Sequence, residues 1–193
     1  MYRYFILAGL ITLGACHKTT IEQPVETPPV MDYTELNQEI AFGQSFFVDI
    51  DQNGSKDFLF YTELVGDPIL KRDYRQFHIG CSYAASLAVD SITDETPALA
   101  KNTAISLGSP QGFNWYNASG VWLARKVIGT TDAPFWEGGW KNASHQFLAV
   151  RVDRAGLGYY GWLEVSFDSQ AEKIILYRAA ICREAGREIR AGA

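Results

Sequence analysis

Apolar and polar residues alternate along much of this chain, most regularly toward its C-terminal end. The segment YYGWLEVSF places three apolar side chains on one face of an extended backbone and three other residues on the opposite face. The two sets are Leu163, Val165 and Phe167, and Trp162, Glu164 and Ser166. This pattern predicts a strand with one buried face.

The preceding segment, QFLAVRVD, alternates in the same way, with Leu148, Val150 and Val152 on one face. Between the two segments lies DRAGLG, whose Asp and Gly residues suit a tight connection. The sequence therefore predicts an antiparallel hairpin formed by these two segments.

Clusters of Gly, Pro, Asn and Asp separate further segments that are rich in β-branched and aromatic residues. The intervals between these segments are too short to contain helices. They are SFFVDI, DFLFYTELV, QFHIGCSYAASLAV, NTAISL, GVWLARKV and KIILYRAAIC. Only DETPALAKNT, residues 94–103, is interpreted as a short helical turn. Many short strands without helical periodicity predict an all-β antiparallel β-sandwich, of jelly-roll or lectin-like form, with a β-barrel as the alternative.

The first sixteen residues, MYRYFILAGLITLGAC, have the layout of a secretory signal. Arg3 precedes an apolar run that is too short to cross a bilayer as a helix. The run ends in Leu-Gly-Ala-Cys, which resembles the bacterial lipobox, in which the Cys becomes the lipidated first residue. We expect residues 1–15 to be a lipoprotein signal peptide and Cys16 to carry a lipid anchor. The alternative is an ordinary signal peptide with an incidental Cys16.

Residues 16–35 are rich in Thr, Glu and Pro, a composition typical of a flexible, extended tether. About 160 residues follow, which suits one domain with a single core. We therefore interpret residues 36–193 as a single β-sandwich domain held to a membrane by the Cys16 lipid.

The formal charge of the chain is −5, from 17 Lys and Arg and 22 Asp and Glu. Removing residues 1–15 takes away Arg3 and no acidic residue, so the charge becomes −6. Nucleic acids and anionic lipids attract clusters of Lys and Arg. The balance therefore argues against nucleic acid or anionic lipid as the main partner.

With Cys16 assigned to the lipid, Cys81 and Cys182 remain. In an oxidising exported compartment these two residues can form a disulfide. Sequence alone does not place their side chains within bonding distance, so the disulfide and two buried free thiols stay as alternatives. The chain has no CxxC spacing, so zinc and redox motifs have no support.

The segment DIDQNGSKDF places oxygen-bearing side chains at positions 1, 3, 5 and 9 of a short loop, with a Gly at position 6. This spacing wraps alternate side chains around one point, and Ca²⁺ takes about six to eight oxygen ligands. The expected ligands are the side chains of Asp49, Asp51, Asn53 and Asp57 and the backbone carbonyl of Ser55.

Two features separate this loop from an EF-hand. Position 12 is Phe60 instead of a bidentate Glu, and the flanking segments are predicted strands instead of helices. We therefore expect a structural calcium site that joins two strands, with a plain turn rich in Asp, Asn and Gly as the alternative. Zinc, copper and iron fit less well, because no His or Cys neighbours the loop.

Enzymatic chemistry has little support in the sequence. The chain lacks GxSxG, HExxH and GxxxxGK[ST], and its His residues, His17, His78 and His145, are isolated. A glycosidase needs two carboxylates about 5 to 10 Å apart, and Glu137 with Glu164 is the pair that the sequence offers. No catalytic residue is assigned, and a carbohydrate-active hydrolase stays as an alternative.

Aromatic residues gather between residues 113 and 140, in FNWYN, VWLAR and PFWEGGW. Sugars stack their C–H faces on exposed aromatic rings, and nearby polar groups fix their orientation. Trp122 and Trp162 lie within predicted strands and are expected to pack in the core or on a sheet face. The candidate ligand-binding residues are Trp115, Trp136, Glu137 and Trp140, with Trp136 and Trp140 expected to form an exposed platform.

Four segments follow one another along the chain: FxxDIDQNGSKDFLF, FWEGGWKNASHQFLAVRV, GYYGWLEVSF and the terminal AAICREAGREIRAG. They resemble a family of exported, surface-tethered bacterial β-sandwich proteins with a DxDxDGxxDF loop and a YGW strand. Leu163, Glu164 and Ala149 depart from that pattern, outside the acidic loop. The resemblance implies the fold and the cellular address, but the family's activity is itself undefined.

Taken together, the sequence predicts a bacterial cell-envelope lipoprotein, on the outer membrane, whose calcium-stabilised domain is a binding or interaction module. The expected partners are the membrane, through Cys16, and a glycan or an envelope protein. The alternatives are a carbohydrate-active hydrolase and a purely structural envelope component.

Overall fold

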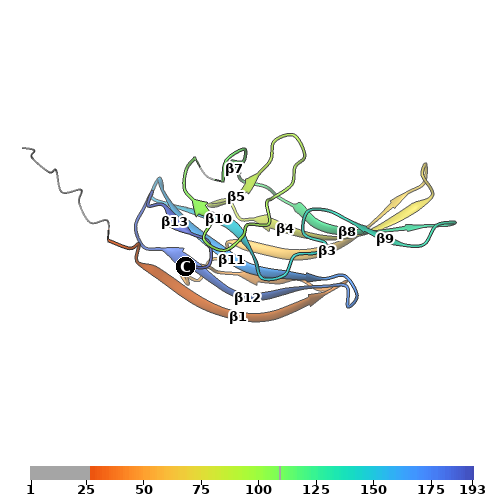
Figure 1. Ribbon diagram of the computed structural model, residues 1–193, viewed down its shortest axis with the longest axis horizontal. Coiled ribbons are helices and arrows are strands. Elements are labelled where there is room, and N and C mark those ends of the chain that lie inside the picture. The colour runs from red at the N-terminus through yellow and green to blue at the C-terminus, as the bar shows by residue number, and fades with distance from the viewer. Residues whose placement is uncertain (1–26, 109) are drawn as a thin grey trace, which may run out of the picture.

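The computed structural model describes residues 27–108 and 110–193. Within those ranges, every regular element is a β-strand, and there is no helix. Two antiparallel sheets pack face to face, and neither closes on itself, so the prediction of an all-β sandwich is confirmed and the barrel alternative is wrong (Figure 1). One sheet has six strands and the other has five.

The six-stranded sheet has its N-terminal strand at one edge. In spatial order it contains β1 (Met31–Ala41), β12 (Lys173–Cys182), β11 (Leu157–Asp168), β10 (Gln146–Arg154), β5 (Ala85–Val89) and β7 (Asn114–Tyr116). The five-stranded sheet contains β2 (Phe46–Val48), β3 (Phe58–Asp67), β4 (Arg72–Cys81), β8 (Val121–Gly129) and β9 (Phe135–Glu137). A two-stranded ribbon pairs β13 (Ile189–Arg190) with β6 (Ala104–Ile105).

The predicted hairpin over the central strands is present. Strands β10 and β11 pair from Gln146 with Val165 to Arg154 with Leu157. Only Ala155 and Gly156 lie between them, with φ angles of +49° and +78°. A two-residue turn with both φ angles positive matches the right-handed twist of the flanking strands, which explains the tight connection.

A first core, between the two sheets, takes one face of each. From the six-stranded sheet come residues such as Leu148, Leu163 and Val165, and from the five-stranded sheet Phe60 and Phe77. All five side chains are buried. The alternating positions of β10 and β11 thus face the core as their spacing predicts.

The alternation predicted one buried face for β11, but its other face is buried as well. Trp162 is fully buried in a second cluster, where its ring meets that of Phe147 edge-on at 5.2 Å between centroids. Ribbon β6–β13 and the C-terminal residues cover this outer face, with Ile105, Ile189 and Ala191 inside the cluster. The six-stranded sheet is therefore the middle layer of three over part of its area.

Close packing reaches the last residues of the chain. Gly192 has a φ of +70°, and a Cβ atom there would collide with the ring of Phe147. Glycine is the residue that tolerates both the left-handed backbone and the contact. The C-terminal segment is therefore fitted against the sheet.

Several boundaries differ from those expected. Strand β1 begins at Met31, so residues 31–35, assigned above to the tether, belong to the sheet. The run QFHIGCSYAASLAV is divided between β4 and β5, which lie in different sheets. Residues 94–103 form no helical turn: Leu99 makes a bridge with Phe147, with both backbone hydrogen bonds at 2.9 Å. Pro97 favours this extended backbone, because the residue before a proline avoids the helical region.

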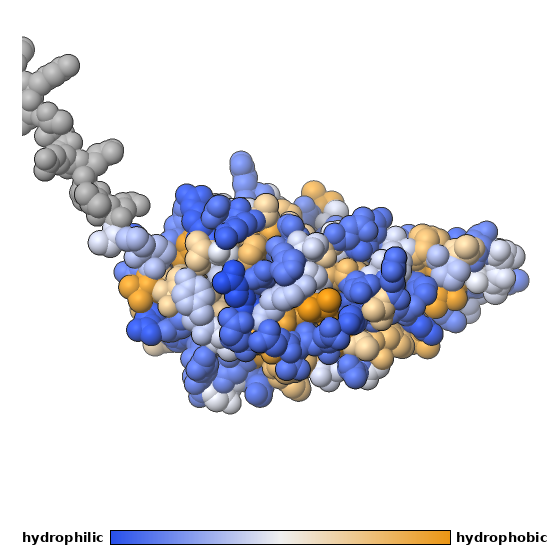
Figure 2. All heavy atoms as spheres, turned by 60° about the horizontal axis from the view of Figure 1, so that its bottom comes forward, coloured by the Kyte–Doolittle hydropathy of each residue, from blue (hydrophilic) through white to orange (hydrophobic). Residues whose placement is uncertain are grey.

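The molecule tapers toward the end formed by the β3–β4 and β8–β9 hairpins (Figure 1). Hydrophobic side chains are exposed at this narrow end (Figure 2), among them Leu64, Ile69, Leu70 and Phe135. The β6–β13 ribbon and the second cluster lie toward the opposite, broad end (Figure 1), so the third layer is absent from the narrow end.

Replacing Ile105 by Ala tests the third layer. The cavity should lower the free energy of unfolding by about 2–5 kcal/mol. Leu107, two residues on, is 70% exposed, and Leu107→Ala should change stability by no more than about 0.5 kcal/mol. Urea unfolding followed by tryptophan fluorescence measures both variants. Equal losses in the two variants would contradict the assigned burial of the outer face.

Candidate functional site

The acidic loop connects β2 to β3 and is closed at its base by the sheet ladder. The backbone N–H of Asp57 donates to the carbonyl of Val48 at 2.9 Å. Within the loop, Gln52 and Gly54 have φ angles of +54° and +89°, which turn the backbone back on itself. The loop is thus compact because its ends are hydrogen-bonded and its middle uses left-handed residues.

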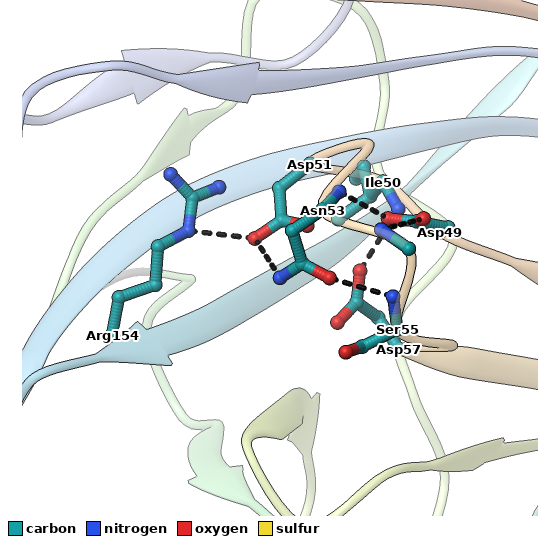
Figure 3. Close-up of polar contacts among 8 residues, drawn as sticks. Asp49, Ile50, Asp51, Asn53, Ser55, Asp57 and Arg154 are labelled. Atoms are coloured by element: carbon teal, nitrogen blue, oxygen red, sulfur yellow. Dashed lines mark hydrogen bonds and ion pairs between the residues drawn. The ribbon is translucent and has the colours of Figure 1, made fainter.

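Three of the predicted ligands converge (Figure 3). One carboxylate oxygen from each of Asp49, Asp51 and Asp57 lies within 4.8 Å of the other two. Asp57 is 3% exposed, and its carboxylate accepts the backbone N–H of Ile50 at 2.9 Å. The three side chains form an oxygen cluster that can hold a metal ion.

The middle of the loop wraps around these carboxylates. The backbone N–H groups of Asn53 and Gly54 donate to Asp49 at 3.2 and 2.8 Å. The side-chain amide of Asn53 donates to Asp51 at 3.0 Å, and its oxygen accepts the N–H of Ser55 at 2.7 Å. Asn53 and Ser55 therefore lie in the same hydrogen-bonded unit as the acidic residues.

Arg154, at the end of β10, completes the electrostatics of the loop. Its Nε lies 2.7 Å from the carboxylate of Asp51, whose side chain is 1% exposed. Three carboxylates and one guanidinium leave a formal charge of −2 in the cluster. Sequence reasoning missed this residue because it is 103 positions away from Asp51 and in the other sheet, and no local pattern indicates the contact.

The pKa of Asp57 is raised to about 6, chiefly by burial and also by the neighbouring Asp51 and Asp49 carboxylates, against the lowering effect of the backbone hydrogen bonds from Ile50 and Asp51. Clustering three acids in a partly buried loop therefore costs free energy when all are ionised. A bound divalent cation would remove this cost, because it would match the residual charge of the cluster.

The aromatic candidates do not form the expected platform. Trp140 is 1% exposed in the first core, and its indole N–H donates to the carbonyl of Thr96 at 2.9 Å. Trp136 packs against the same core, with its ring 4.9 Å from that of Phe167. The prediction that Trp136 and Trp140 are exposed together is wrong.

Trp115 also packs against the protein. Its ring lies 5.3 Å from that of Tyr160 beside the second cluster, and its N–H donates to the carbonyl of Ser106 at 2.9 Å. Trp162 is buried and Trp122 is half-buried on a sheet face, so the expectation that these two pack in the core or on a face is confirmed.

The two carboxylates of the hydrolase alternative do not face each other. Trp136 points into the core, so its neighbour Glu137 points outward from the five-stranded sheet. Glu164 lies between core-facing Leu163 and Val165, so it points outward from the six-stranded sheet. The two carboxylates therefore lie on opposite outer faces of the sandwich.

The two cysteines are free thiols, and the disulfide alternative is wrong. Cys81 ends β4 and packs against the first core, whereas Cys182 ends β12 in the second cluster. The six-stranded sheet separates these clusters. Burial raises the pKa of the Cys81 thiol to about 11 and also raises the pKa of Cys182, so both stay protonated at neutral pH.

The outer face of the five-stranded sheet carries aromatic rings that sequence reasoning did not connect. The guanidinium of Arg125 lies over the rings of Tyr74 and Trp122, at 4.8 and 4.7 Å from their centroids. Glu137 holds this guanidinium in place with contacts of 2.7 Å to Nε and Nη2. The rings therefore already have a partner within the protein.

His78 and His145, isolated in the sequence, have definite partners. His78 stacks on Tyr61 at 4.8 Å between centroids, and its Nε2 lies 2.9 Å from the side-chain oxygen of Gln76. Burial lowers the pKa of His78. His145 Nδ1 lies 2.8 Å from Glu164, and its ring stacks on Tyr177 at 4.1 Å.

Comparison of the chain with protein-family models, curated proteins and solved structures found no match. The resemblance to exported, tethered β-sandwich proteins therefore stays a prediction. Residues 1–15, Cys16, His17 and the first part of the tether lie outside the described residues. Within residues 27–108 and 110–193, no helix has the length and apolar character needed to cross a membrane.

Glu164 and its partners Arg178 and His145 form a polar network on the outer face of the six-stranded sheet, and Glu164 provides a test of it. Burial alone would raise its pKa, but hydrogen bonds from Arg178, at 2.6 Å, and from His145 outweigh burial and lower the pKa below 4.5. Its stabilising contribution is therefore present above about pH 4.5 and is lost as the pH falls through the folded-state pKa.

The variant Glu164→Gln should lose about 1–3 kcal/mol of stability at pH 7. The difference from the wild type should shrink as urea unfolding is repeated from pH 7 down to pH 3. Asp73→Asn, which changes an exposed carboxylate, serves as the control. A pH-independent loss in Glu164→Gln would show that the ion pairs do not stabilise the fold.

Proposed function

We propose that this chain is a lipid-anchored protein of the bacterial cell envelope whose β-sandwich binds a structural Ca²⁺ and acts as a binding module for carbohydrate. The observation that carries the calcium assignment is the convergence of Asp49, Asp51 and Asp57 within 4.8 Å. The remaining parts of the proposal are supported by the sequence, chiefly the lipobox that ends at Cys16.

Calcium suits the chemistry of the donor set. Every side chain in the loop that points into the cluster offers oxygen, and Ca²⁺ accepts carboxylates, amide oxygens and backbone carbonyls in a flexible geometry. Asp49, Asp51 and Asp57 would supply the charge, and the Asn53 side chain and the Ser55 carbonyl the neutral ligands. The cluster charge of −2, after Arg154 is counted, equals in size the charge of the ion.

The ion would act on stability and not on a substrate. The loop joins β2 to β3, and Asp57 is hydrogen-bonded to the backbone at both Val48 and Ile50. Neutralising the three acids would therefore fix the first hairpin of the five-stranded sheet. A binding module benefits from such a fixed scaffold, because rigid elements hold ligand-contacting residues without an ordering cost.

A binding role is favoured over hydrolysis by the positions of the carboxylates. The pair that motivated a hydrolase, Glu137 and Glu164, is divided between the two outer faces, and each member is held by arginine: Glu137 by Arg125 and Glu164 by Arg178. Carboxylates with such partners act as structural ion pairs.

Calcium binding is tested by thermal unfolding of the full chain in detergent, with Ca²⁺ or with EGTA. At about 100 times the dissociation constant, Ca²⁺ should add about 2.7 kcal/mol to the stability. For a domain of this size the expected rise in Tm is about 5–10 °C. Isothermal titration with Ca²⁺ and, in parallel, Mg²⁺ measures the selectivity.

The variant Asp57→Asn distinguishes the stabilising effect of the bound ion from the stability of the loop itself. It should abolish the Ca²⁺-dependent rise in Tm, yet in EGTA it should be at least as stable as the wild type, because it removes repulsion at a buried carboxylate. Asp132→Asn, which changes an exposed carboxylate, should keep the full rise. If EGTA leaves the Tm of the wild type unchanged, the calcium assignment is lost.

A further inference from the structure

A hollow of about 320 Å³ opens at the β7 edge of the six-stranded sheet. Val89, Ser91, Asp94, Asn114 and Tyr116 line it. Its volume is at the lower end of the range of about 300–1,000 Å³ that ligand pockets occupy. It is distant in sequence from the acidic loop and contains none of the residues predicted to bind a ligand.

The hollow exists because the second sheet does not extend over this edge. Asn114 and Tyr116 pair in register with Val89 and Leu87, whose side chains belong to the first core. Trp115, between them, points to the opposite face and packs beside the second cluster. Asn114 and Tyr116 therefore point to the core side of the sheet, yet Tyr116 is 63% exposed.

A hydrogen-bonded turn, residues 90–94, forms the other wall. The carboxylate of Asp90 accepts the backbone N–H groups of Ile92 and Thr93 at 2.7 and 3.0 Å. The N–H of Asp94 donates to the carbonyl of Asp90 at 2.9 Å, and Asp94 has a φ of +55°. These hydrogen bonds place Asp94 beside the hollow.

The polar side chains of the hollow are available to a ligand. Within the described residues, the side chains of Ser91, Asp94, Asn114 and Tyr116 make no hydrogen bond or ion pair with the protein. This differs from the outer face of the five-stranded sheet, where Arg125 covers the rings of Tyr74 and Trp122. The hollow offers one uncovered aromatic ring beside a carboxylate, an amide and a hydroxyl.

We infer that this hollow is a binding subsite for a neutral sugar residue of a glycan. The ring of Tyr116 would stack on the C–H face of the sugar. Asp94 accepts hydrogen bonds, and Asn114 both donates and accepts, so together they suit the vicinal hydroxyls that distinguish sugars from apolar ligands. The inference names the ligand site of the binding module proposed above and rests on that proposal.

The test uses the full chain in detergent with Ca²⁺, applied to an array of neutral chito-, cello-, manno- and xylo-oligosaccharides. The wild-type protein should bind to at least one of these series of oligosaccharides. Titration of that oligosaccharide should then show at least a tenfold weaker affinity for Tyr116→Ala, and a weaker affinity for Asp94→Asn. Tyr83→Ala, which removes a fully exposed tyrosine outside the hollow, is the matched control and should bind like the wild type.

The outcomes separate the subsite from the general proposal. If the wild type binds a glycan and Tyr116→Ala binds it equally well, the hollow is not the site, while the binding module stands. If the wild type retains no oligosaccharide although Ca²⁺ still raises its Tm, both the subsite and the carbohydrate ligand class are overturned. Equal losses of affinity in Tyr116→Ala and Tyr83→Ala would also overturn the assignment of the hollow as the site. Thermal unfolding of each variant verifies that the variant is folded.

Discussion

Strands β10, β11 and β12 carry apolar side chains on both faces, and each face needs its own cover. The five-stranded sheet covers one face, and the β6–β13 ribbon with the C-terminal residues covers part of the other. Polar residues on this outer face are nearly buried as well. Glu164, for example, is 8% exposed. Burial at this level requires partners for the charge, and Arg178 and His145 supply them. The packing of the middle layer thus determines where ion pairs must form.

The acidic loop depends on the same layer. Ile50, between two of the acidic residues, is 1% exposed and belongs to the first core. Its Cδ1 would lie 3.2 Å from a Cβ atom at Gly161, so the absence of a side chain in β11 makes room for it. The loop is further joined to β10 by the pair of Asp51 with Arg154. Although it connects two strands of one sheet, it is fixed to the other, and changes in the loop therefore reach the core.

The sequence predicted the features that depend on local spacing and missed those that depend on distant contacts. Alternation identified the β10–β11 hairpin, and the DxDxNGxxD spacing identified the three carboxylates that meet. Strand β1 was missed because its polar residues resemble those of a tether, and β13 because two residues carry no pattern, whereas β6 lies within the predicted segment NTAISL.

The error at Trp140 has a specific cause. Its glycine neighbours suggested an exposed loop, but Gly138, with a φ of +106°, lies where a Cβ atom would meet the backbone of Leu123 and the ring of Trp122. The glycine marks a close approach of two strands and not an open surface. A single sequence does not distinguish these two reasons for glycine.

The order of strands also determines how the domain would carry a pulling force. The described chain enters at β1, and the hollow beside Tyr116 lies at β7, the opposite edge of the sheet. Tension between an N-terminal anchor and a ligand held at β7 would pass through the strand ladders in series. The β1–β12 ladder has nine residue pairs, whereas the β10–β5 and β5–β7 ladders have three each. In the arrangement proposed above, with an anchor before β1 and a glycan at β7, the short β5–β7 ladder would separate under load before the longer β1–β12 ladder.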